Sequence, residues 1–191
     1  MARLIERRAM VVGGALAAAL AFRPHPLFAA DPAGTVMGKG PGDFDFLTGE
    51  WKIKHRRFDP SGPDGPRELD GSATVRRILG GMGSIEELRK GDGSIFGMGV
   101  RVWHSREQLW ADHWTAAEDG VVNPPQLGRF LDGAGIFTAD DEMDGQPVKV
   151  KAVWDQITPT SCRWHQMMSR DGGMSWERGW YMDWMRVGGG A

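Results

Sequence analysis

Cysteine and tyrosine are almost absent from this sequence. Cys162 is the only cysteine in 191 residues, so the chain cannot form an internal disulfide. Its stability must come from a packed core, which a chain of this length can build as one domain. Cys162 lies in an alternating segment, and we interpret it as a packed core residue rather than a reactive thiol. One tyrosine stands against nine tryptophans, so indole rings supply most of the large aromatic surface.

The sequence also lacks a hydrophobic run long enough to cross a bilayer as a helix. The uncharged run at 9–22 has about fourteen residues, whereas a membrane helix needs roughly 18–20. A basic start precedes this run and small residues follow it, which is the pattern of a cleavable signal peptide over residues 1–30. Arg7 and Arg8 favour a twin-arginine signal, and the general secretory route is the alternative. We expect a periplasmic or secreted bacterial protein.

Basic residues are too few for a nucleic-acid-binding protein. Without residues 1–29 the chain holds 19 Lys+Arg and 24 Asp+Glu, a formal charge of −5, and no basic block stands out. The sequence has no phosphate-binding loop, no dinucleotide fingerprint, no nucleophile elbow and no histidine pair at metal-ligand spacing. We therefore expect neither a nucleic acid nor a metal ion as a partner, while the oligomeric state stays open.

What the mature part contains is a series of alternating apolar and polar segments divided by turn residues. This period of two indicates half-buried antiparallel strands. After a flexible Gly/Pro linker at 31–43 we expect a short helical turn at 44–49 and then nine strands, at 51–58, 72–79, 84–89, 97–104, 108–115, 129–139, 148–157, 161–169 and 176–187. Short turns join many of them, and closure would remove the exposed edges of so long a sheet. The prediction is an all-β, antiparallel up-and-down β-barrel of about 8–10 strands over residues 44–188.

Residues 43–51 read Asp-Phe-Asp-Phe-Leu-Thr-Gly-Glu-Trp. They resemble the opening of a bacterial, exported, lipocalin-like (calycin-type) barrel family of unassigned function. Its members begin Phe-x-Phe-Leu-x-Gly-x-Trp and end on an aromatic strand with a closing arginine, and the similarity extends distantly to lipocalins. The resemblance implies that Gly49, Trp51 and Arg186 close the barrel floor. Stacking of a guanidinium on an indole contributes about 0.5–2 kcal/mol.

Nitrobindin-type haem barrels are distant relatives of this family and carry Gly-x-Trp-x-Gly-x-Gly. Ile53 and His55 stand at the two later glycine positions in this chain. Haem is therefore disfavoured, and no cofactor is expected.

A second motif, Ser-Arg-Asp-Gly-Gly-Met-Ser-Trp at 169–176, resembles the Asp-box turn of sialidase propellers. A single copy does not make a propeller, whose motifs recur in every blade. We interpret Ser169, Asp171, Gly173 and Trp176 as a hairpin turn, in which the carboxylate accepts hydrogen bonds from the turn.

Alternation also predicts which side chains face the barrel interior. On the strand at 97–104 the inward residues would be Val100, Val102 and His104. The interior residues expected to bind a ligand are His55, His104, Asp112, Trp114, Trp154, Trp164, Gln166, Arg178 and Trp180. An unpaired buried charge costs several kcal/mol, so Arg178 should meet Asp112, water or an acidic ligand.

Three functions fit this interior. The favoured hypothesis is an exported barrel that binds a small, largely apolar or aromatic molecule among indoles and a few polar anchors. An enzyme could use the same cavity, with His104 or His55 as general base and Arg178 as anion anchor. A barrel filled by tryptophan would instead act through its outer surface in the cell envelope. The volume left inside the barrel separates the third hypothesis from the first two.

The twin-arginine interpretation predicts the route of export. Replacing both Arg7 and Arg8 by lysine should leave the precursor in the cytoplasm, because that route reads the arginine pair. Cell fractionation and immunoblotting measure the precursor and mature forms, with Arg3→Lys as the matched control. Normal export of the double variant would assign the chain to the general secretory route.

Overall fold

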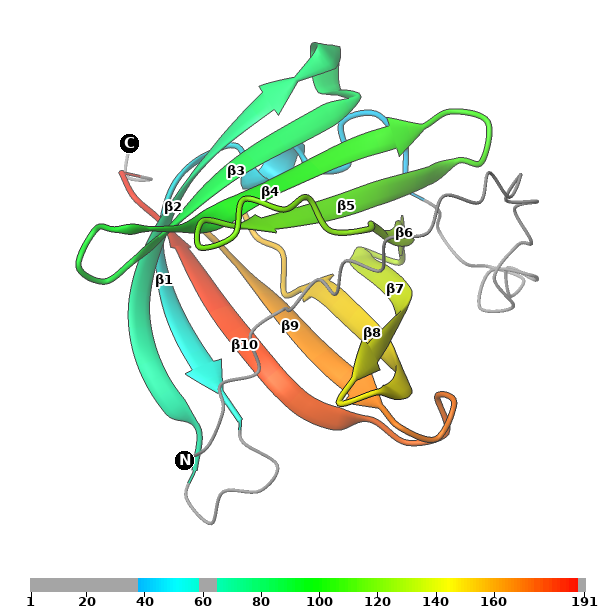
Figure 1. Cartoon of the computed structure of the whole chain (residues 1–191). Coiled ribbons are helices and arrows are strands. Elements are labelled where there is room, and N and C mark those ends of the chain that lie inside the picture. Colours follow the sequence, from blue (N-terminus) through cyan, green and yellow to red (C-terminus); the bar gives the residue numbers. More distant parts are fainter. Residues whose placement is uncertain (1–37, 59–64, 189–191) are drawn as a thin grey trace.

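The computed structural model of the protein describes residues 38–58 and 65–188 (Figure 1). Ten antiparallel strands pair in the order β1-β10-β9-β8-β7-β6-β5-β4-β3-β2 and close into a barrel. The strands are β1 (Gly49–Arg57), β2 (Arg67–Ile78), β3 (Gly83–Lys90), β4 (Ile95–His104), β5 (Leu109–Ala116), β6 (Gln126–Leu131), β7 (Ala134–Met143), β8 (Gln146–Asp155), β9 (Ser161–Ser169) and β10 (Glu177–Arg186). Two short 3-10 turns, η2 (Asp45–Leu47) and η3 (Leu79–Gly81), are the helical elements of the described residues. The predicted all-β, up-and-down barrel is confirmed.

One expected strand is in fact two strands. The segment at 129–139 is divided into β6 and β7 by Asp132 and Gly133, whose φ angles are 50° and 80°. Two successive residues with positive φ make the two-residue turn that suits strand twist, and Asp-Gly is a favoured sequence for it. The expected helical turn at 44–49 is present as η2. The expected signal peptide at 1–30 lies outside the described residues.

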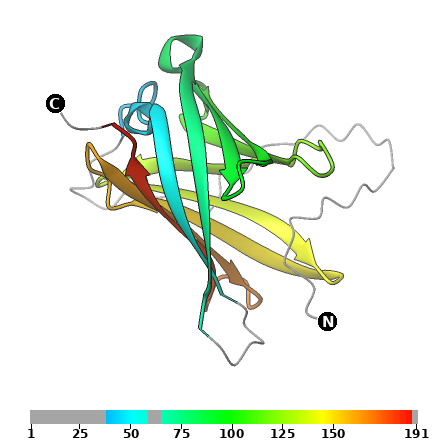
Figure 2. The same ribbon diagram turned by 90° about the vertical axis from the view of Figure 1, so that its left-hand side faces the viewer.

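Two curved walls face each other in Figures 1 and 2, β2–β5 on one side and β7–β10 on the other. On one side β1 joins the walls, and it pairs with β10 from Trp51 to Arg57. On the other side the seam is short, because β5 pairs with β6 only from Trp110 to Asp112. We call the end of the barrel at Trp51 the floor and the end at Arg57 the mouth.

Aromatic rings fill the interior, and glycines on neighbouring strands make room for them. A Cβ atom on Gly97 would lie 2.4 Å from the Trp114 ring, and one on Gly128 would lie 2.7 Å from the Phe137 ring. Any larger residue at these positions would therefore push a packed ring aside. At these two positions a bulky ring and a glycine on the adjacent strand fit together.

Residues 38–48, which precede β1, fold across the floor, and we call them the plug segment. The Phe44 ring lies 5.0 Å from the rings of Trp110 and Phe130, edge to face with both. The Trp110 indole donates a hydrogen bond to Asp43, and the backbone N–H of Gly38 donates one to the Phe130 carbonyl. The last part of the expected flexible linker is thus folded against the barrel, because its polar groups and Phe44 find partners there.

Arg186 joins the floor to the end of the last strand. Its guanidinium carbon lies 4.3 Å from the centre of the Trp51 ring, the stacking that the resemblance implied. The same guanidinium donates hydrogen bonds to the carbonyls of Phe46 and Thr48, both at 2.6 Å, and its Nε donates one to Pro159 at 2.8 Å. One side chain therefore ties the plug segment, β1 and the β8–β9 loop together.

Gly49 leaves the space that this guanidinium occupies. Its φ angle is 130°, and a Cβ atom would lie 2.7 Å from Arg186 Nη1. Only glycine satisfies both conditions without strain. The Gly-x-Trp motif thus has a physical basis. The glycine leaves space for the Arg186 guanidinium, and the tryptophan ring stacks against it.

The floor contacts predict coupled losses of stability. Trp51→Ala should lower the free energy of unfolding by about 3–5 kcal/mol, as large aromatic truncations in cores do. Arg186→Ala should lower it by about 1–3 kcal/mol through the lost stack and hydrogen bonds. Urea unfolding of both single variants and the double variant measures their coupling. Met185→Ala, at an exposed position, is the control. If the losses of the two single variants add up to that of the double variant, the stack contributes nothing to stability.

Candidate ligand site in the barrel interior

A small cavity lies inside the barrel among four indole rings. Its volume is about 30 Å³, which is room for a water molecule or two. The residues that line it are Glu86, Leu88, Gly99, Arg101, Asp112, Trp114, Trp154, Trp164, Trp180 and Met182. Asp112 and the four tryptophans were expected in the interior from alternation alone. The structure brings them together with two charged residues that were not expected there, Glu86 and Arg101.

Glu86, Arg101 and Asp112 form a buried ion group at this cavity. Arg101 Nη2 donates a hydrogen bond of 2.6 Å to Glu86 Oε2, and the two side chains are only 4% and 3% exposed. Asp112 Oδ1 lies 3.5 Å from Arg101 Nε, which is too long for a strong hydrogen bond. Within the described residues, Nε and Nη1 of Arg101 have no hydrogen-bond partner. The group therefore contains one more carboxylate than guanidinium and has spare hydrogen-bonding capacity.

Aromatic faces and carboxylates together keep Arg101 charged. Its guanidinium carbon lies 5.1 Å from the Phe44 ring centre and 5.2 Å from that of Trp154. Burial acts to lower the pKa of Arg101, but the charges of Asp112 and Glu86 outweigh this and raise it. Burial also raises the pKa of the nearby Cys162 to about 12, so this thiol is neutral and packed, as expected.

Arg178 does not face the interior, and this prediction is wrong. The register of β10 against β9 shifts between Arg178 and Trp180, so that Arg178 pairs with Met167 and Trp180 with Gln166. This bulge at Gly179 turns the arginine to the outer face, where it is exposed and lies 5.9 Å from the Phe58 ring centre. Arg101, not Arg178, is the partner of Asp112.

His104 was also placed wrongly. On β4 the inward positions are Gly97, Gly99 and Arg101, whereas Val100 and Val102 face outward and His104 is exposed. The two valines suggested the opposite face, because apolar alternation is normally the best guide to the interior. Here glycines occupy the inner face, since the rings that pack over them need the space. The enzyme hypothesis therefore loses His104 as a base and Arg178 as an anion anchor.

His55 and Gln166 face the interior nearer the mouth but do not line the cavity. The His55 ring is 5% exposed and stacks on Trp180 at 5.5 Å. The Trp180 indole donates a hydrogen bond of 3.1 Å to His55 Nδ1, which places the ring proton on Nε2. Burial and the nearby Arg57 lower the pKa of His55 to about 4. The lone pair on Nδ1 is occupied, so His55 acts as a partner for Trp180 and is a poor general base.

Three half-buried rings cover the cavity on the mouth side. Trp180 and Trp114 both pack against Phe96, with ring centres 5.7 Å apart in each pair. Phe96 reaches this position because β4 is bulged opposite Leu88. Arg57 lies over Trp180 at 4.1 Å and over Phe96 at 5.4 Å. We call Phe96, Trp114 and Trp180 the mouth cluster.

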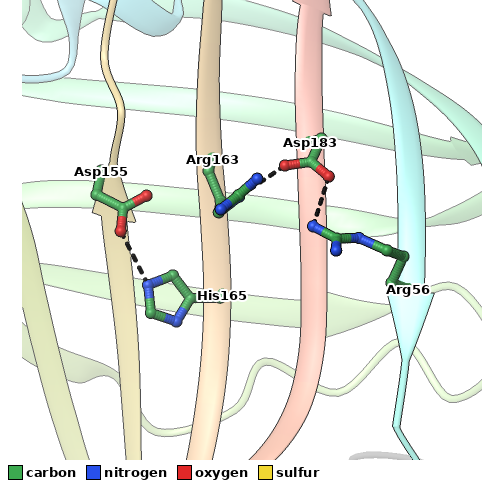
Figure 3. A network of polar contacts seen from close by, with 5 residues as sticks. All are labelled: Arg56, Asp155, Arg163, His165 and Asp183. Atoms are coloured by element: carbon green, nitrogen blue, oxygen red, sulfur yellow. Dashed lines mark hydrogen bonds and ion pairs between the residues drawn. The ribbon is translucent and has the colours of Figure 1, made fainter. Parts of the chain in front are cut away.

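A separate polar network lies on the outer face of four adjacent strands (Figure 3). Arg56 and Arg163 each bind Asp183 at 2.7 Å, and His165 Nε2 lies 3.1 Å from Asp155 Oδ2. The residues come from β1, β10, β9 and β8, so the network links these strands side by side. Its ion pairs are about a third exposed and screened by water, so each contributes little to stability.

The turn between β9 and β10 has the expected Asp-box character. Asp171 accepts hydrogen bonds from the Ser175 backbone, the Ser175 hydroxyl and the Ser169 hydroxyl, and these bonds lower its pKa. Gly173 has a φ angle of 102° and lies against the Trp176 ring. On this ring Lys151 Nζ makes a cation–π contact, 3.9 Å from the ring centre. The motif serves the hairpin and does not reach the cavity.

A wider depression of about 360 Å³ lies outside the floor, between Lys39, Phe46, Phe130 and Ile157. It is open to solvent and contains no buried charge. Within residues 38–58 and 65–188 no three His, Cys, Asp or Glu side chains are grouped to hold a metal ion. In the same residues no helix has the length and apolar character needed to cross a membrane.

Comparisons with known protein families and with curated proteins found no match.

The pKa of His55 predicts a pH-dependent loss of stability. As the pH falls from 6.5 to about 4, the unfolded chain binds a proton at His55 and the folded protein does not. This proton uptake should cost the wild type roughly 3 kcal/mol across the window, at about 1.4 kcal/mol per pKa unit. Urea unfolding at pH 7.0, 5.5 and 4.5 should show a shallower dependence for His55→Gln. His165→Gln is the outer-face control, and parallel curves for wild type and His55→Gln would contradict the prediction.

Proposed function

We propose that the protein is an exported, lipocalin-like barrel that binds a small, largely apolar or aromatic molecule between the mouth cluster and the Glu86–Arg101–Asp112 group. The observation that carries this proposal is the ion group itself. Replacing a buried ion group by apolar residues is often neutral or stabilising, so such a group is weak evidence for stability. Unpartnered donors of Arg101 and a weakly bonded Asp112 in one cavity are better explained by a guest molecule.

The present cavity is too small for an aromatic ligand, so binding requires the mouth cluster to move. Its three rings are only partly buried, in contrast to Trp51, Trp154 and Trp184, which are 1% exposed. The barrel wall is also weakest on this side. Among the described residues, the part of β7 beyond Thr138 pairs with β8 alone. Few backbone hydrogen bonds therefore resist an opening between β5 and β7.

A second candidate is a packed barrel that acts through its outer surface. The cavity volume of about 30 Å³ favours it, since a filled interior has no room for a guest. The two candidates differ in one measurable property, which is whether any molecule enters the barrel.

Binding of a neutral probe tests the proposal. N-phenyl-1-naphthylamine should bind with low micromolar to millimolar affinity and quench tryptophan emission, because several indoles surround the cavity. In Gly99→Ala a Cβ atom would lie 3.4 Å from its nearest neighbour, so the methyl group occupies the cavity without a clash. This variant should keep or slightly raise the free energy of unfolding, by up to about 1 kcal/mol, and weaken the probe at least tenfold.

Gly65→Ala is the matched control, because a Cβ atom there meets nothing within 4 Å. Equal probe affinity in Gly99→Ala and the wild type would place the probe on the outer surface. No binding to the wild type would favour the packed barrel.

A further inference from the structure

The charges that line the cavity do not balance. Glu86 and Asp112 contribute two negative charges and Arg101 one positive charge. His55, the nearest inward-facing histidine, is neutral because burial lowers its pKa to about 4. The cavity therefore has a net charge of about −1 in a region from which water is largely excluded, where an uncompensated charge is costly.

Asp112 is the carboxylate with capacity to spare. Glu86 is 3% exposed and is committed to Arg101 through a hydrogen bond of 2.6 Å. The Asp112 side chain is 15% exposed, and among residues 38–58 and 65–188 its one polar contact is the long one to Arg101 Nε. Carboxylate oxygens accept several hydrogen bonds each, so Asp112 can bind a further donor.

The walls around this carboxylate are π faces. Trp164 and Trp180 stand edge to face with ring centres 5.5 Å apart, and Trp114 and Trp154 complete the lining. Arg101 already shows that a cation is accommodated here, since its guanidinium lies over the Trp154 ring at 5.2 Å. Indole faces attract cations most strongly where water is excluded.

An acidic guest would meet opposing forces. It could bind the unpartnered Nη1 of Arg101, but two carboxylates line the same cavity and would repel it. Arg57 and Lys90 lie over the rings of Trp180 and Phe96, and neither lines the cavity. Because Glu86 and Asp112 already balance the charge of Arg101, the cavity attracts an anion less strongly than a lone arginine would.

Resting on the proposed function, we propose that this cavity takes the ammonium group of a small organic cation, held by Asp112 and the faces of the surrounding indoles. The apolar part of the guest would extend toward the mouth cluster. The expected ligand class is thus a primary amine with an aromatic or aliphatic body, and not a carboxylic acid.

Three probes of nearly equal size test the charge preference on the wild-type protein. Calorimetric titration at pH 7 and low ionic strength compares 2-phenylethylammonium, 2-phenylethanol and phenylacetate. The ammonium should bind at least tenfold more tightly than the alcohol, and phenylacetate most weakly. Equal or tighter binding of the alcohol or the acid would overturn the inference. The proposed function would still stand in that case if Gly99→Ala weakens the probe that binds.

Asp112→Asn assigns the preference to one carboxylate. In this variant the ammonium should bind no more tightly than the alcohol, and exposed Glu118→Gln should behave like wild type. A persisting tenfold preference in Asp112→Asn would mean that the cation binds elsewhere, and would overturn the inference. If Asp112→Asn does not fold, Gly99→Ala decides, because it keeps every charge and must lose the ammonium. If none of the three probes binds, the inference fails, and binding of N-phenyl-1-naphthylamine then shows whether the proposed function fails with it.

Discussion

The contacts that hold the floor of the barrel together converge on one guanidinium. Arg186 stacks on Trp51 and donates to carbonyls from the plug segment and from the β8–β9 loop. Backbone pairing joins β1 to β10 from Trp51 to Arg57, and Arg186 adds side-chain contacts at the floor end of this pairing. Hydrogen bonds from a charged donor are the strong ones, and the planar guanidinium makes three while covering an indole. One side chain therefore supplies both the stack on the first strand and the hydrogen bonds to the two neighbouring segments.

The interior is densely packed next to the floor. The Trp184 ring lies against both Trp51 and Trp154, with ring centres 5.9 and 5.5 Å away. The space that the rings leave lies nearer the mouth, next to Gly99. The ion group occupies the boundary between the dense floor and the looser mouth. Packing thus decides the position of the polar group, and not the reverse.

Alternation predicted most of the barrel, since a period of two reports directly which face of a strand is apolar. It failed where the apolar face is not the inner face, as on β4, whose inner residues are Gly97, Gly99 and Arg101. The ion group was missed for the same reason, because an arginine between two valines normally faces solvent while the valines face the core. Arg178 was misplaced by a bulge, which shifts the side of every residue beyond it. The signal that could have found Arg101 was the pair Gly97 and Gly99 on the same face of β4, where side chains from neighbouring strands need space.

Ion pairs inside and outside this barrel have different physical meaning. Arg56, Arg163 and Asp183 on the outer face stay hydrated, so their presence demands little explanation. Arg101 and its two carboxylates are removed from water, and their desolvation opposes the attraction between them. A core of the same volume built from leucine and phenylalanine would close the barrel at least as well. The proposed cationic guest rests on the charge of the group, which has two carboxylates for one guanidinium. The half-buried mouth cluster above it is where the proposed guest would enter.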